Sequence, residues 1–287
     1  MAAVAVTHFS DRLADAVANK RSQLVVGIDP VVAQLPEELR RYEPAEAFRL
    51  FGLGLVDAVA DHAVAVKPQS AFFEAIGADG VRVFADLCAY ARDAGLLVIA
   101  DAKRGDIGST ARAYAEAFIP LADAVTVNPY LGRDSLEPFV DACRREGAGL
   151  FCLVKTSNPG SADVQDVALA DGRPLWQHVA SLVRELGDEL VGRSGLSSVG
   201  AVVGATFPEH VAEARALLPR TPFLLPGIGA QGGKPADLAP AFAAGPGSAL
   251  VSASRSVIYA SGGDDWRGAA AAEAERLASE TRRAAAA

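Results

Sequence analysis

Two carboxylates and an ammonium group stand directly after one apolar run near the middle of the chain. Residues 96–100 are apolar, and Asp101, Lys103 and Asp106 follow them. Such a run is typical of a buried parallel strand, and because strand side chains alternate between two sides, Asp101 and Lys103 should point the same way. Buried charges are unfavourable unless they pair or act on a charged ligand. We therefore predict a functional site here, with incidental salt bridges at a solvated strand end as the alternative.

The chemistry expected of this group is proton transfer. A lysine flanked by two carboxylates has its charged form stabilised. This favours Lys103 as a proton donor and argues against a neutral amine that attacks carbonyl carbons. Asp101 would then lie where its charge acts on a departing group.

A glycine-rich stretch and an arginine predict an anion site. Residues 226–233 read Pro-Gly-Ile-Gly-Ala-Gln-Gly-Gly before a predicted helix, and Arg255 follows the last predicted strand. Glycines let backbone N–H groups approach an anion, and a guanidinium offers paired donors to phosphate oxygens. A structural turn is the alternative. With the charged array, this predicts a phosphorylated small molecule as ligand, on which Lys103 protonates a developing carbanion.

The elements that must position these groups alternate regularly along the chain. Eight short apolar runs, which predict strands, are separated by eight amphipathic stretches, which predict helices. This pattern predicts a (β/α)8 barrel, with a doubly wound open sheet as the alternative, because nearly every run ends in polar or turn-forming residues that would meet on one face. The predicted strands are 24–29, 63–67, 96–101, 124–128, 149–155, 199–205, 222–226 and 248–252, and the predicted helices are 46–61, 70–93, 109–120, 135–146, 175–193, 209–217, 236–243 and 265–283.

The whole chain of 287 residues is expected to form one domain, because no linker or change of composition divides it. A leading helix over about residues 9–20 would close the bottom of the barrel. The connection 156–174 is long for a strand-to-helix loop, which favours a mobile lid over a passive insertion. The alanine-rich end predicts a final helix with a frayed tail.

Composition limits the possible partners and location. A net charge of −8 argues against a nucleic-acid surface, and no apolar run approaches the ~20 residues needed to span a membrane. The absence of a basic-then-apolar leader predicts a cytoplasmic protein. Three cysteines at spacings unlike any zinc motif predict reduced, mostly buried thiols, and the dispersed histidines predict neither a metal site nor a catalytic triad.

Several motifs in order resemble the orotidine 5'-phosphate decarboxylase family, in its longer, type 2 branch. The similarity spans about residues 24–260 and is more specific than any single motif. Its parts are Asp101-x-Lys-x-x-Asp-Ile-Gly-Ser-Thr110, Val66-Lys-Pro-Gln-Ser-Ala-Phe-Phe-Glu74, Lys155-Thr-Ser-Asn-Pro-Gly160, the glycine-rich stretch 226–233 and Ser254-Arg-Ser-Val-Ile-Tyr259.

The resemblance implies decarboxylation of orotidine 5'-phosphate to uridine 5'-phosphate without metal or organic cofactor. Lys103 would protonate C6 of the substrate, and Asp101 would lie against the substrate carboxylate, either repelling it or orienting Lys103. Asp106 would come from the partner subunit of a homodimer. The implied substrate contacts are Asp29 and Lys67 for the ribose hydroxyls, Thr110 of the partner subunit for the ribose, Ser157 for the pyrimidine, and Gln231, Gly232 and Arg255 for the phosphate.

Two other functions compete with this interpretation. A magnesium-dependent sugar-phosphate decarboxylase or aldolase of the same barrel suprafamily would need further carboxylate ligands, and the candidate Glu74 lies in a predicted helix past the strand end. A non-catalytic nucleotide-binding protein would keep the phosphate site but would not need the array of Asp101, Lys103 and Asp106.

Overall fold

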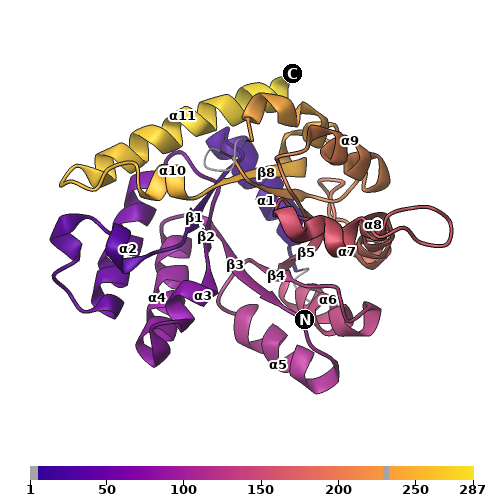
Figure 1. Cartoon of the computed structure of the whole chain (residues 1–287), viewed down its shortest axis with the longest axis horizontal. Coiled ribbons are helices and arrows are strands. Elements are labelled where there is room, and N and C mark those ends of the chain that lie inside the picture. The colour runs from indigo at the N-terminus through magenta and orange to yellow at the C-terminus, as the bar shows by residue number, and fades with distance from the viewer. Residues whose placement is uncertain (1–5, 229–232) are drawn as a thin grey trace, which may run out of the picture.

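The structure is a computed structural model that describes residues 6–228 and 233–287. Eight parallel strands form a closed barrel in sequence order, with helices packed around it (Figure 1). The barrel closes where β1 (Leu24–Ile28) pairs with β8 (Ala249–Ala253) as well as with β2 (Ala65–Pro68). The predicted (β/α)8 barrel is therefore confirmed, since an open sheet would leave two edge strands unpaired.

The other elements follow the predicted alternation along the chain. The remaining strands are β3 (Leu97–Arg104), β4 (Ala124–Val127), β5 (Gly149–Lys155), β6 (Val199–Val203) and β7 (Phe223–Pro226). The helices are α1 (Phe9–Lys20), α2 (Pro44–Val59), α3 (Ser70–Glu74), α4 (Gly77–Asp93), α5 (Gly108–Phe118), α6 (Arg133–Glu146), α7 (Ala162–Gln165), α8 (Leu175–Gly187), α9 (Pro208–Leu217), α10 (Arg255–Ile258) and α11 (Trp266–Ala286).

Three predicted helices differ from the observed ones. The stretch 70–93 is two helices, because Gly77 adopts a left-handed φ of 77° that ends α3 and lets α4 begin in a new direction. The stretch 236–243 belongs to a 3-10 helix (Pro235–Phe242), in which Pro240 has no N–H to donate. The stretch 175–193 is α-helical only to Gly187 and then tightens into a short 3-10 turn (Asp188–Leu190).

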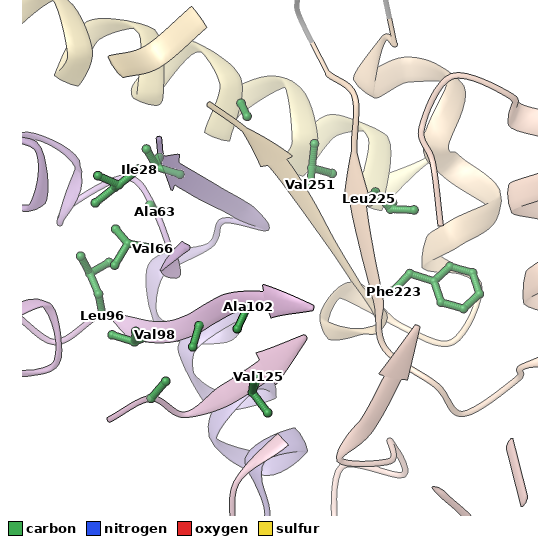
Figure 2. Close-up of a cluster of buried hydrophobic side chains, with 14 of the residues drawn as sticks. Ile28, Ala63, Val66, Leu96, Val98, Ala102, Val125, Phe223, Leu225 and Val251 are labelled. Atoms are coloured by element: carbon green, nitrogen blue, oxygen red, sulfur yellow. The ribbon is translucent and has the colours of Figure 1, made fainter. Parts of the chain in front are cut away.

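Side-chain alternation along the strands separates two apolar cores. Figure 2 shows Ile28, Val66, Val98 and Val125 among the buried side chains of the core that packs against the surrounding helices. The neighbouring residue Ile99 belongs instead to the core inside the barrel. Because Asp101 is two residues beyond Ile99, this alternation points its carboxylate into the barrel.

The interior core is covered at the N-terminal ends of the strands by α1. Phe9 of this helix packs edge to face against Phe151 of β5, with ring centroids 5.9 Å apart. Arg12 forms an ion pair with the buried Asp123, whose other oxygen accepts a hydrogen bond of 2.8 Å from the Val98 N–H of β3. The charged groups predicted to form a site are at the opposite, C-terminal end of the barrel.

No helix in the described part of the chain is long and apolar enough to cross a membrane.

Candidate active site

Asp101 is the centre of a charged cluster at the C-terminal ends of β2, β3 and β4. One of its carboxylate oxygens lies 2.5 Å from Nζ of Lys67, and the other forms an ion pair with Nζ of Lys103. The Oγ1 of Thr126 donates a hydrogen bond of 3.0 Å to that second oxygen. Asp101 and Lys67 are buried, whereas the Lys103 side chain is 43% exposed. The predicted pairing of Asp101 with Lys103 is therefore present, and it faces the open end of the barrel.

The backbone of β3 turns sharply to present Lys103. Lys103 has a φ of 46°, in the left-handed region that residues with a Cβ rarely adopt. The pairing of β3 with β4 shifts register between Ala100 and Arg104, and the Lys103 N–H donates a hydrogen bond of 2.9 Å to Oγ1 of Thr126. Thr126 thus holds both the backbone of Lys103 and the carboxylate that pairs with its ammonium group. A strained backbone held in this way is typical of a functional site.

The charges of this cluster determine the protonation states. Burial alone would raise the pKa of Asp101, but the ammonium groups of Lys67 and Lys103 outweigh it and hold the pKa well below its usual range. Burial alone would lower the pKa of Lys67, but the carboxylates of Asp101 and Asp29 outweigh it and raise that pKa. At neutral pH Asp101 is therefore a carboxylate and Lys67 an ammonium group.

This electrostatic arrangement predicts an acid-sensitive contribution to stability. Because the folded-state pKa of Asp101 is depressed, its stabilising effect is fully present above the unfolded-state pKa of about 3.9 and is lost as the pH falls towards the folded-state value. We expect the free energy of unfolding of the wild type to fall by on the order of 2 kcal/mol more than that of Asp101→Asn between pH 6 and pH 2.5. Urea unfolding followed by circular dichroism at each pH measures this, and parallel curves for the two proteins would contradict it.

Asp29 forms a second polar group beside the cluster, at the end of β1. One of its carboxylate oxygens accepts a hydrogen bond from Oγ of Ser254, which follows β8. The other oxygen, Oδ1, is buried and has no hydrogen-bond partner among the described residues. Because a buried acceptor without a partner is unfavourable, a hydroxyl of a bound ligand would satisfy it. The charge of Asp29 also acts on Lys67, so the two predicted ribose contacts lie on the same side of the barrel mouth.

Ser157 lies across the mouth, just beyond the end of β5. Its backbone nitrogen and Cβ lie 2.9 Å from the position that a Cβ at Gly204 would take. Gly204 follows β6 and donates its N–H to the carbonyl of Lys155 at 2.8 Å. The absence of a side chain at Gly204 thus allows Ser157 to pack closely against the end of β6.

The predicted phosphate site is only partly within the described structure. Gln231 and Gly232 lie outside the described residues. Gly227 has a φ of 111°, and a Cβ at Gly233 would stand 2.8 Å from the Gly227 carbonyl oxygen, so both ends of the glycine-rich stretch require glycine. Arg255 begins α10 after β8, and its side chain is exposed. The ends of β7 and β8 lie side by side, because these two strands pair along four residues.

Asp106 and Thr110 make no hydrogen bond or ion pair with the cluster among residues 6–228 and 233–287. The Asp106 carboxylate accepts a hydrogen bond of 2.8 Å from the N–H of Ile107, and within the described residues it makes no ion pair with Lys103. Thr110, in the first turn of α5, is exposed. The two residues lie on the rim of the barrel rather than in the cluster.

Two hydroxyl groups of the site, those of Thr126 and Ser254, were absent from the predicted residues. Thr126 is the only polar residue of β4, and a lone hydroxyl in an apolar strand is the signal that could have identified it. Its partner lies 25 residues away, so no local motif joins them. Ser254 appeared only as part of a motif, and its contact with Asp29 spans 225 residues.

Glu74 forms an ion pair with Arg104 on the outer side of β3. The guanidinium of Arg104 also lies over the rings of Tyr114 and Phe118, at 5.4 and 5.2 Å from their centroids. Within residues 6–228 and 233–287, no group of three histidine, cysteine or acidic side chains could hold a metal ion. Glu74 is thus engaged in a structural contact.

The chain is similar in sequence and in fold to proteins of one known family. The sequence model of the orotidine 5'-phosphate decarboxylase / HUMPS family matches residues 23–271. The orotidine 5'-phosphate decarboxylase of Rhodopirellula baltica is 45% identical over 268 residues, covering 88% of each chain, and that of Deinococcus radiodurans is 45% identical over 260 residues, covering 89% of this chain and 91% of the relative. The solved structure of Leishmania donovani OMP decarboxylase has a TM-score of 0.77 and 35% identity, covering 98% of this chain and 100% of that one.

Proposed function

Because the chain belongs to the orotidine 5'-phosphate decarboxylase / HUMPS family, we propose that its site converts orotidine 5'-phosphate to uridine 5'-phosphate and carbon dioxide. The reaction is that of a carboxy-lyase in pyrimidine synthesis. The single observation that carries the proposal is the cluster of Asp101 with Lys67 and Lys103 at the open end of the barrel.

Lys103 is the proton donor in this proposal. The bond between C6 of the pyrimidine and its carboxylate breaks, carbon dioxide leaves, and the electron pair remains on C6. The Lys103 ammonium group gives a proton to that carbon and becomes a neutral amine. Its side chain is 43% exposed, so a proton from solvent can restore the charged form.

Asp101 orients Lys103 in this proposal. Its support is the pair of contacts that the carboxylate makes, one with each lysine, together with the hydrogen bond from Thr126. A carboxylate held by three donors is fixed in place before the substrate arrives, which is the preorganisation that transition-state stabilisation requires. Its charge would also lie against the substrate carboxylate, so a contribution from ground-state repulsion is compatible with the same geometry.

The remaining contacts are assigned by their position around the mouth. Asp29 and Lys67 bind the ribose hydroxyls, which the unpartnered Oδ1 of Asp29 supports. Ser157 contacts the pyrimidine from the opposite side. The phosphate lies beyond the ends of β7 and β8, held by Gln231, Gly232 and Arg255; the support here is the adjacency of these strands and the exposed guanidinium.

We further propose a cytoplasmic homodimer in which Asp106 and Thr110 complete the partner's site. Its support is a set of exposed apolar side chains beside them, since such groups on a rim favour an interface. Ile107 is 57%, Tyr130 80% and Leu131 46% exposed. The three cysteines are free and buried, which fits a reducing compartment.

The activity is tested directly by mixing the protein with orotidine 5'-phosphate and following the change in absorbance as uridine 5'-phosphate forms. We expect turnover that a chelator such as EDTA does not reduce. Loss of turnover with the chelator would favour the magnesium-dependent alternative. Binding of the nucleotide without turnover would favour a non-catalytic nucleotide-binding protein.

A further inference from the structure

The loop that follows β5 folds back and contacts the end of that strand at two successive residues, Lys155 and Thr156. Nζ of Lys155 lies 2.6 Å from a carboxylate oxygen of Asp166, which directly follows α7. The Thr156 N–H donates a hydrogen bond of 2.9 Å to Oε1 of Gln165, whose Nε2 donates one of 2.7 Å to Oγ1 of Thr156. The loop therefore leaves the barrel at β5, turns through α7 and returns to its own starting point.

The two sides of this attachment differ in burial. The Lys155 side chain is 4% exposed, whereas that of Asp166 is 40% exposed. Among the described residues, Asp166 is the only acidic group that pairs with Lys155. Because a buried ammonium group without a counterion is strongly unfavourable, Lys155 holds Asp166, and with it the loop, at the end of β5.

Ser157, the proposed pyrimidine contact, lies directly beside this attachment. Thr156, held by Gln165, comes immediately before it, and on its other side Ser157 packs against Gly204. The backbone and Cβ of Ser157 are thus confined by the residue that precedes it and by the strand end that it touches. A displacement of about 1 Å at such a position can reduce turnover by two orders of magnitude.

We propose that Asp166 and Gln165 are positioning residues, which act through Lys155 and Thr156 to hold the loop 156–174 against the barrel mouth and to orient Ser157 towards the substrate. This inference rests on the proposed function, because it assumes that Ser157 contacts the pyrimidine. It adds a role for two residues of the loop that lie outside the set of substrate contacts.

The first test is Asp166→Asn, with Asp163→Asn as the matched control. Asp163 is an exposed residue of α7 that undergoes the same change of charge and forms no ion pair among the described residues. We expect Asp166→Asn to lower kcat/KM about 10- to 100-fold, with changes in both kcat and KM, and Asp163→Asn to have no effect. Hydrogen exchange at residues 162–170 should be about tenfold faster in Asp166→Asn only.

Gln165→Ala covers the case in which Asp166→Asn does not fold, because it removes two hydrogen bonds without leaving a buried charge unpaired. Asp166→Glu keeps the charge and should recover part of the lost activity. If Asp166→Asn and Gln165→Ala both fold and both retain wild-type kinetics, the proposal is wrong.

A double-mutant cycle separates positioning from general stabilisation. If Asp166 acts by orienting Ser157, then Ser157→Ala should lower kcat/KM in the wild type but have much less effect in the Asp166→Asn background. If the ion pair only stabilises the fold, Asp166→Asn should lower the melting temperature without its own effect on orientation. Ser157→Ala should then lower kcat/KM by the same factor in both backgrounds, so that the effects of the two substitutions multiply. Independent, multiplying effects would therefore overturn the proposal.

The outcome also distinguishes this inference from the proposed function. A wild-type protein that does not turn over orotidine 5'-phosphate contradicts the proposed function. Hydrogen exchange at residues 162–170 in Asp166→Asn still tests the attachment in that case, because this measurement needs no substrate. If Asp166→Asn has normal turnover and an unchanged rate of hydrogen exchange in the loop, the attachment is contradicted. The proposed function is not contradicted by that result.

Discussion

Lys103→Ala is expected to reduce kcat by at least about 1,000-fold, which corresponds to about 4 kcal/mol of lost transition-state stabilisation. The variant removes the only ammonium group of the cluster that is open to the mouth, since Lys67 is buried against Asp101. Binding of the product uridine 5'-phosphate should persist, because the proposed ribose and phosphate contacts remain. The loss should therefore appear in kcat rather than in nucleotide affinity.

Steady-state kinetics and a titration with uridine 5'-phosphate measure these two quantities separately. Lys20→Ala provides a matched control, because Lys20 ends α1 at the other end of the barrel and donates its hydrogen bond to the Ala60 carbonyl. It should retain wild-type turnover per folded molecule. A Lys103→Ala protein with near-normal kcat would remove the proton donor from the proposed mechanism.

Mixing two inactive variants is expected to restore activity if Asp106 completes the site of a partner subunit. Lys103→Ala and Asp106→Ala homodimers should each be nearly inactive, because every site lacks one of the two groups. In a mixed dimer, one site lacks both groups and the other has both. With random pairing about half of the dimers are mixed, so about a quarter of all sites should recover.

The structure gives this experiment a physical basis. The Asp106 carboxylate accepts a hydrogen bond from its own neighbour, Ile107, and makes no ion pair with Lys103 of the same chain within the described residues. Co-refolding the variants, with a size tag on one chain to count mixed dimers, measures the recovery. Mixed dimers that form without activity would mean that both residues serve the site of one chain.

The sequence by itself determined the barrel and the centre of the site. Strand and helix periods are local properties, so eight apolar runs were sufficient to predict eight strands. The shared direction of Asp101 and Lys103 followed from the same reasoning, because residues two positions apart on a strand point to the same side, and the two side chains form an ion pair. The helix break at Gly77 and the 3-10 helix at Pro240 were missed, since apolar periodicity alone does not report the backbone geometry that these two residues impose.

Only the tertiary structure decided which distant groups meet. Lys67 reaches Asp101 across 34 residues because β2 pairs with β3, and Ser254 reaches Asp29 across 225 because closure of the barrel pairs β1 with β8. The attachment of Asp166 to Lys155 likewise depends on how the loop folds back on its strand. These contacts follow from strand register and loop path, which are set by packing across the whole barrel and are not encoded in any one segment.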